Sequence, residues 1–175
     1  MSGVLFSPHS DDETLFAFYT VLRHRPRVVI CFPSVRDYGH TSIRYYESRL
    51  AMTLAGAPGV TQWHAEDGPE LEALMRRWDR GSLTDTVWAP SPEASHPQHV
   101  LVARAALELF GDRVRQFHTY DENGKVRRGR KVAIEPGWED IKRQALRCYE
   151  TQIRHPRAGQ FFEEARFELD EYEVP

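Results

Sequence analysis

Two short segments of this chain combine residue types that bind metals. In PHSDDE, His9 is followed by three acidic residues, of which Asp11 and Asp12 come first, where an apolar run ends. In SHPQH, His96 and His99 lie three positions apart. Two imidazoles and one carboxylate suit zinc with an open coordination position. The two segments together therefore predict a metal centre built from His9, Asp12 and His99.

Helix capping is the simpler explanation for part of these segments. Ser10 with Glu13 three residues later matches a capping box, and Ser95 with Gln98 matches another. Acidic residues in a first turn also suit the helix dipole. Capping gives no reason for His9, however, and little reason for two consecutive aspartates.

A metal with an open position would hold a water molecule and lower its pKa towards about 7. Neighbouring residues in a turning backbone point in different directions, so Asp12 can bind the metal while Asp11 lies beside the water and accepts its proton. His96 is placed to donate a hydrogen bond to the oxyanion. This chemistry is hydrolysis at a carbonyl group.

The elements that must position these residues alternate along the chain. β-rich runs over 4–7, 27–32, 60–64, 86–89 and 114–119 are interleaved with helical patterns over 13–23, 42–55, 69–80 and 99–110. The alternation predicts a single α/β domain over 1–175, Rossmann-like, with a mostly parallel sheet and helices on both faces. Each histidine-bearing turn follows a strand, and such turns line the ligand-binding crevice of open α/β sheets.

The last third of the chain departs from this alternation. Residues 121–124, Asp-Glu-Asn-Gly, are a turn signal, and 125–134 reads as an extended arm, so a hairpin is expected there. A final helix is predicted over 139–152. The acidic tail ARFELDEYEVP is expected to add an edge strand.

Composition excludes several classes of protein. The chain has 175 residues, 41% of them hydrophobic, and a net charge of −3 with a pI near 6.2, which argues against a general nucleic-acid-binding protein. No apolar run approaches the roughly 20 residues that a membrane span needs, and the N-terminus lacks signal-peptide features, so a cytoplasmic location is expected. Cys31 and Cys148 are too few and too scattered for a disulfide framework.

Both segments resemble the signature of the PIG-L/LmbE-like family of zinc-dependent N-deacetylases. Its first-strand His-Pro-Asp-Asp-Glu resembles PHSDDE, and its later His-x-x-His resembles HPQH. The resemblance implies that His9, Asp12 and His99 bind Zn²⁺, with Fe²⁺ or Co²⁺ as alternatives. It also implies that Asp11 is the general base and that His96 stabilises the tetrahedral intermediate. The implied substrate is a small N-acetylated amino sugar or its conjugate, and a homo-oligomer is allowed.

Looser similarities extend over most of the chain. IRYYESRLAMTLAG resembles the family's Arg-x-x-Glu helix and implies that Arg44 contacts substrate hydroxyls, although a surface ion pair with Glu47 would explain it equally well. HAEDGPEL implies a similar substrate contact for Asp67, and KRQALRCYETQ resembles a late helix that ends in Gln152.

Two departures from the family pattern leave other functions open. Many members have an aspartate that can orient the first histidine of the late motif, but this chain has Gln98 there, which implies a less basic His96. Some members have a tyrosine where this chain has Ala94. The alternatives are a metal-dependent hydratase or lyase on the same scaffold, and a catalytically idle glycoside-binding module.

The segment GKVRRGRKV, residues 124–132, concentrates positive charge on the expected hairpin arm, at Lys125, Arg127, Arg128, Arg130 and Lys131. Charged residues on an edge strand often serve only to block aggregation, and that is the favoured explanation. The alternative is contact with a phosphate-bearing substrate.

Overall fold

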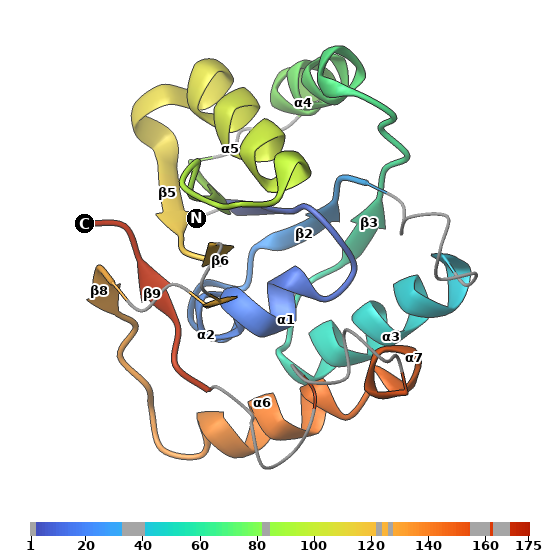
Figure 1. The fold of residues 1–175 in the computed structure, drawn as a ribbon, viewed down its shortest axis with the longest axis vertical. Coiled ribbons are helices and arrows are strands. Elements are labelled where there is room, and N and C mark those ends of the chain that lie inside the picture. The colour runs from blue at the N-terminus through green and yellow to red at the C-terminus, as the bar shows by residue number, and fades with distance from the viewer. Residues whose placement is uncertain are drawn as a thin grey trace.

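The computed structural model describes residues 3–32, 41–81, 85–121, 124–125, 128–154, 162 and 169–175. These residues form a seven-stranded sheet in the order β3-β2-β1-β4-β5-β9-β8, flanked by helices (Figure 1). The first five strands along the chain pair in parallel: β1 (Gly3–Ser7), β2 (Arg27–Ile30), β3 (Val60–Gln62), β4 (Thr86–Pro90) and β5 (Val114–Phe117). The predicted α/β, Rossmann-like fold with a mostly parallel sheet is confirmed.

The direction of strand addition reverses at β1. The chain runs from β1 through β2 to β3 on one side, and then adds β4 and β5 on the other. Leu5 of β1 lies opposite Val28 of β2 and Trp88 of β4. The segments after β1 and β4 therefore leave the sheet side by side, at the switch point where open α/β sheets bind ligands.

Helices cover both faces of the sheet, as Figure 1 shows, with α4 and α5 on one side and α2, α3 and α6 on the other. Alternate strand residues feed two cores: Leu5 packs in a cluster with Phe18 of α2, and Phe6 in a cluster with Val102 of α5. The helices are α1 (Asp12–Phe16), α2 (Phe18–His24), α3 (Thr41–Leu54), α4 (Gly68–Gly81), α5 (Pro97–Phe110), α6 (Trp138–Leu146) and α7 (Glu150–Ile153), with a short 3₁₀ turn at Gly111–Arg113.

The helix predicted over 13–23 is in fact two helices, interrupted at Ala17. The cause is a distant residue, Glu171, whose buried carboxylate accepts hydrogen bonds from the backbone N–H groups of Phe18 and Tyr19 and so caps α2. Lys142 of α6 pairs with this carboxylate at 2.5 Å. The prediction of one continuous helix is wrong because nothing in the local sequence reveals this cap.

The last predicted helix, over 139–152, is also divided, into α6 and α7. Glu47 of α3 accepts hydrogen bonds from the backbone N–H of Thr151, at 2.8 Å, and from its hydroxyl group. A carboxylate at a helix N-terminus satisfies backbone donors that have no partner within the helix. Glu47 therefore fixes the start of α7 against α3.

The expected hairpin is present, because β6 (Tyr120–Asp121) pairs in antiparallel fashion with β7 (Gly124–Lys125). The tail forms β9 (Tyr172–Glu173), but β9 lies between β5 and β8 (Arg130–Lys131). On this side of the sheet the edge strand is therefore β8 and not the tail. Within the described ranges, none of the helices is both long and apolar enough to cross a membrane.

Candidate metal centre and active site

The two histidine-bearing turns meet at the carboxyl edge of the sheet. Oδ2 of Asp12, the first residue of α1, lies 3.1 Å from Nδ1 of His9 and 3.1 Å from Nε2 of His99. All three side chains are buried, and the three possible ligand atoms lie within 4.8 Å of one another. The backbone N–H of His9 also donates to Asp12 Oδ2, at 3.0 Å, which fixes the carboxylate in the turn. The geometry suits one small cation held by two nitrogens and one oxygen.

The outer nitrogen of each imidazole is occupied by a neighbour. His9 Nε2 lies 2.7 Å from Oε1 of Gln98, and His99 Nδ1 lies 3.1 Å from the hydroxyl of Thr119. A carboxamide oxygen only accepts hydrogen bonds, so His9 carries a proton on Nε2 and its neutral form turns the Nδ1 lone pair inward. Such partners orient metal-binding histidines in many proteins.

The surroundings of His99 Nε2 fit a divalent cation at this place. Its Nε2 is buried and, although close to Asp12, makes no hydrogen bond within the described part of the chain. Buried polar atoms without partners are rare in folded proteins, and a metal ion would supply one here. That these three residues bind a metal remains a prediction, which the donor set and this unpartnered nitrogen both support.

Charge interactions in the trio oppose the effect of burial. Burial alone would raise the pKa of Asp12, but His99 and His9 outweigh it and hold that pKa well below its usual range. Burial lowers the pKa of His9, but the hydrogen bond with Asp12 and the charge of Asp12 raise it. The net change is an increase. The carboxylate thus stays ionised and draws positive charge to this point. A metal ion can take the place of that charge.

Asp11 lies beside the trio without joining it. It is the N-cap of α1 but makes no capping hydrogen bond with its side chain. Its Oδ2 instead lies 2.6 Å from Nη2 of Arg44, and both side chains are largely buried. Burial raises the pKa of Asp11, while Arg44 opposes the increase. Asp11 is thus a carboxylate beside the trio that Arg44 holds in place, and its role as a general base stays a prediction.

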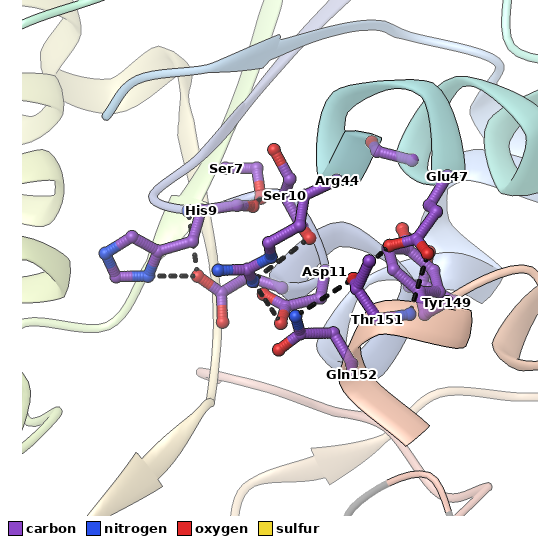
Figure 2. A network of polar contacts seen from close by, with 12 residues as sticks. Ser7, His9, Ser10, Asp11, Arg44, Glu47, Tyr149, Thr151 and Gln152 are labelled. Carbon is purple, nitrogen blue, oxygen red and sulfur yellow. Dashed lines mark hydrogen bonds and ion pairs between the residues drawn. The ribbon is translucent and has the colours of Figure 1, made fainter. Parts of the chain in front are cut away.

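Arg44 therefore has a partner that the sequence did not reveal. It also donates to the backbone oxygen of Ser10, at 3.3 Å, and Figure 2 shows its guanidinium group beside Asp11, with Gln152 of α7 pointing into the same cluster. The alternative of a surface ion pair with Glu47 is wrong, because Arg44 is buried against Asp11 and Glu47 bonds to Thr151. A substrate contact from Arg44 remains a prediction.

Glu13, the last acid of PHSDDE, stabilises the turn between β1 and α1 through hydrogen bonds. Its buried carboxylate accepts hydrogen bonds from the hydroxyl groups of Ser7, Ser48 and Tyr149, and from the backbone N–H of Asp11. Burial raises the pKa of Glu13 to about 7, although the bonds from Ser48 and Tyr149 lower it. These contacts join β1, α3 and the segment between α6 and α7, next to the turn that carries His9 and Asp12.

The capping box predicted for Ser10 and Glu13 does not form. Asp11 occupies the N-cap position, and Ser10 Oγ has no hydrogen-bond partner among the residues that the structure describes. The second predicted box is also wrong, since His96 and not Ser95 is the N-cap of α5. His96 Nδ1 accepts from the backbone N–H of Gln98 at 3.2 Å.

His96 lies against the trio, with its ring centroid 4.9 Å from that of His9 and 5.2 Å from that of His99. Burial, and then the positive charge of His9 and His99, lower the pKa of His96 to about 4. Because Nδ1 accepts from Gln98, the neutral ring carries its proton on Nε2. The Gln98 side chain contacts His9. The lowered pKa of His96 has the direction expected from the sequence, with burial as its largest cause.

Tyr120 is a site residue that sequence reasoning missed. Its ring centroid lies 5.1 Å from that of His99 and 6.5 Å from that of His96. Burial, followed by the charges of Asp12 and Asp11, raises its pKa. Because Tyr120 follows the fifth predicted strand, its place at the carboxyl edge was a usable signal. Tyr120 therefore supplies an aromatic ring at the site, although this chain has Ala94 where some members of the family it resembles have a tyrosine.

Asp67 has a structural role at the start of α4. Its Oδ1 accepts a hydrogen bond from the backbone N–H of Glu70, at 2.9 Å. Its backbone oxygen accepts one from the backbone N–H of Leu71, at 3.1 Å. This cap explains the residue without a substrate. A substrate contact from Asp67 is still a prediction.

Three of the basic residues predicted on the hairpin arm form ion pairs. Arg128 pairs with Glu93 at 2.6 Å, Arg130 with Glu173 at 2.5 Å and Lys131 with Asp170 at 2.7 Å. Arg127 lies outside the described residues, as does the Lys125 side chain. These pairs favour the edge-strand explanation over a phosphate contact from this arm.

Solved structures share this fold. A deacetylase of teicoplanin biosynthesis matches with a TM-score of 0.73 and 16% identity, over 87% of this chain and 85% of that one. The N,N'-diacetylchitobiose deacetylase of Pyrococcus horikoshii matches with a TM-score of 0.66 and 18% identity, over 86% of this chain and 70% of that one. At such identities the likeness establishes the fold.

A protein of different activity also matches. The 4-carboxy-2-hydroxymuconate hydratase of Pseudomonas putida has a TM-score of 0.69 and 18% identity, over 92% of this chain and 82% of that one. Comparisons of the sequence with protein-family profiles and with curated proteins find no match. Solved proteins of this fold thus include both deacetylases and a hydratase.

Proposed function

We propose that this protein is a metal-dependent hydrolase that removes an N-acetyl group from an amino sugar or an amino-sugar conjugate. The observation that carries the proposal is the buried group of His9, Asp12 and His99 with the ionisable carboxyl group of Asp11 directly beside it. The fold shared with two deacetylases supports the choice of amide hydrolysis. Zinc is the metal that this ligand set favours, with iron and cobalt as alternatives.

A divalent ion held by the three side chains would act as a Lewis acid toward the amide carbonyl and the attacking water. The residues of the chain perform the proton transfers. Asp11 accepts a proton from the water as its oxygen bonds to the carbonyl carbon, and later gives that proton to the departing nitrogen. The carbon–nitrogen bond then breaks, and the products are acetic acid, which ionises to acetate, and a free amine.

His96 and Arg44 assist this sequence in different ways. The neutral ring of His96 can donate its Nε2–H to the oxygen that becomes negative in the tetrahedral intermediate. Arg44 holds Asp11 in place through the 2.6 Å ion pair. Contacts from Arg44 and Asp67 to sugar hydroxyls are part of the proposal.

A second candidate function is hydration or elimination on the same scaffold, favoured by the shared fold with the hydratase. In that reaction Asp11 would exchange a proton with carbon. The third candidate, a glycoside-binding module without activity, would keep the fold and lose turnover.

The test is acetate release by the metal-loaded protein from a panel of N-acetylglucosamine conjugates, run beside the Asp11→Asn variant. Acetate release that the variant lacks supports the hydrolase. Turnover of unsaturated 2-hydroxy acids without acetate release would instead support the hydratase. Saturable glycoside binding with no turnover of either class would support the idle module.

A further inference from the structure

A recess lies at the end of the sheet opposite to the candidate metal centre. It has a volume of about 490 Å³, and its lining includes Gly3 and Thr86, the first residues of β1 and β4. The metal-binding turns follow the last residues of these same strands. A strand of five residues spans about 16 Å, so a small ligand in this recess does not reach the metal centre.

The recess carries more positive than negative charge among the residues that the structure describes. Its lining includes Arg23, Arg115, Arg130 and Glu173, and Arg130 is paired with Glu173. Arg23 donates to the backbone oxygen of Ala133, and Arg115 donates to two backbone oxygens. Within the described ranges, neither Arg23 nor Arg115 has a carboxylate partner. Two guanidinium groups from α2 and β5 are therefore available to an anion.

A polar donor and an aromatic surface complete the lining. The side-chain nitrogen of Gln116 is buried and has no hydrogen-bond partner in the part of the chain that is described. His24 stacks on Trp88, with ring centroids 5.1 Å apart and planes 27° apart. Trp88 lies so close over Gly3 that an added Cβ there would collide with its ring. The recess thus pairs cationic and amide donors with a flat aromatic surface.

We infer that this recess binds the phosphate group of a small phosphomonoester. Guanidinium groups match phosphate oxygens in geometry, and two uncompensated positive charges suit a dianion better than a carboxylate. The volume lies within the range of small-molecule sites and exceeds that of a bare phosphate ion, which leaves room for an organic group against Trp88 and His24.

Isothermal titration of the metal-loaded protein with AMP, ribose 5-phosphate, inorganic phosphate and adenosine tests this inference. The recess variant is Arg23→Gln combined with Arg115→Gln. Its matched control is Arg49→Gln combined with Arg104→Gln, which removes two exposed arginines elsewhere. We expect saturable binding of at least one phosphomonoester, weakened on the order of 10-fold or more in the recess variant and unchanged in the control. Comparison of AMP with ribose 5-phosphate and inorganic phosphate shows which part of the ligand contributes.

A substitution that should strengthen binding makes the test sharper. Glu173→Gln removes the carboxylate of the recess and frees Arg130, so phosphomonoester affinity should increase several-fold. The inference is overturned if no phosphate-bearing probe binds saturably, if the recess variant binds as well as the wild type, or if adenosine binds as well as AMP. Phosphate held only by the metal would persist in the recess variant, and would likewise overturn it.

Discussion

Oε1 of Gln98 lies 2.7 Å from Nε2 of His9, and this contact joins the two histidine-bearing turns. Gln98 occupies the position before His99, so one side chain steers the imidazole of the opposite turn. Because the amide oxygen can only accept, it selects the His9 tautomer whose Nδ1 faces Asp12.

Gln98→Leu should therefore weaken metal binding. Leucine cannot hold the His9 tautomer, and losses of such orienting partners typically cost about 10- to 100-fold in metal affinity. The measurement is competition for Zn²⁺ against a chelator of known affinity. Gln144→Leu, at an exposed position of α6, is the control and should bind as the wild type does. Equal affinity in both variants would show that Gln98 does not orient His9.

Asp11→Asn should keep the metal and lose most turnover. An amide has nearly the same shape but cannot accept the proton, and loss of general-base catalysis costs about 10²- to 10⁴-fold. Initial rates of acetate release, with metal content measured on the same sample, separate the two effects. Asp112→Asn, at an exposed position, is the control. Near-normal turnover in Asp11→Asn would mean that another group is the base.

Arg44→Gln tests whether Arg44 positions Asp11 or holds the substrate. Loss of the ion pair lets the Asp11 carboxylate move, so kcat should fall on the order of 10²-fold while metal content stays the same. Arg49→Gln, on the exposed face of the same helix, should behave as the wild type. A rise in KM with unchanged kcat would instead assign Arg44 to substrate binding.

Lys142→Met should destabilise the whole fold. Lys142 and Glu171 are both 0% exposed, and removal of one partner leaves a buried charge that costs about 3–5 kcal/mol. Urea unfolding followed by circular dichroism measures the change. Lys131→Met removes an exposed ion pair and should leave the unfolding curve nearly unchanged. A similar small effect in both variants would show that the buried pair does not stabilise the junction between α1 and α2.

Strand and helix order could be predicted from the sequence because it depends on local patterns. The runs that became β1 and β4 show apolar stretches ending in polar turns, so the meeting of His9 with His99 followed from parallel-sheet geometry. The breaks at Ala17 and before α7 could not be predicted, since the carboxylates responsible, Glu171 and Glu47, are more than 100 positions away along the chain.

Site residues divide in the same way. The grouping of His9, Asp12 and His99 could be predicted because ligand chemistry restricts residue types and both turns follow predicted strands, whereas their binding of a metal stays a prediction. The partners of Arg44 and Gln98 were not, because each is set by helix packing and by a side-chain rotamer. Asp67 was chosen by resemblance as a substrate contact, but its cap at the start of α4 explains the residue without a substrate.

Elemental analysis of protein purified without chelator shows whether His9, Asp12 and His99 hold a metal ion. The wild type, His99→Ala and His64→Ala would be analysed together, because His64 is exposed and serves as the control. We predict about one divalent metal per chain in the wild type and in His64→Ala, and almost none in His99→Ala. Full occupancy in His99→Ala, or a wild type free of metal, would mean that these three residues do not form a metal site.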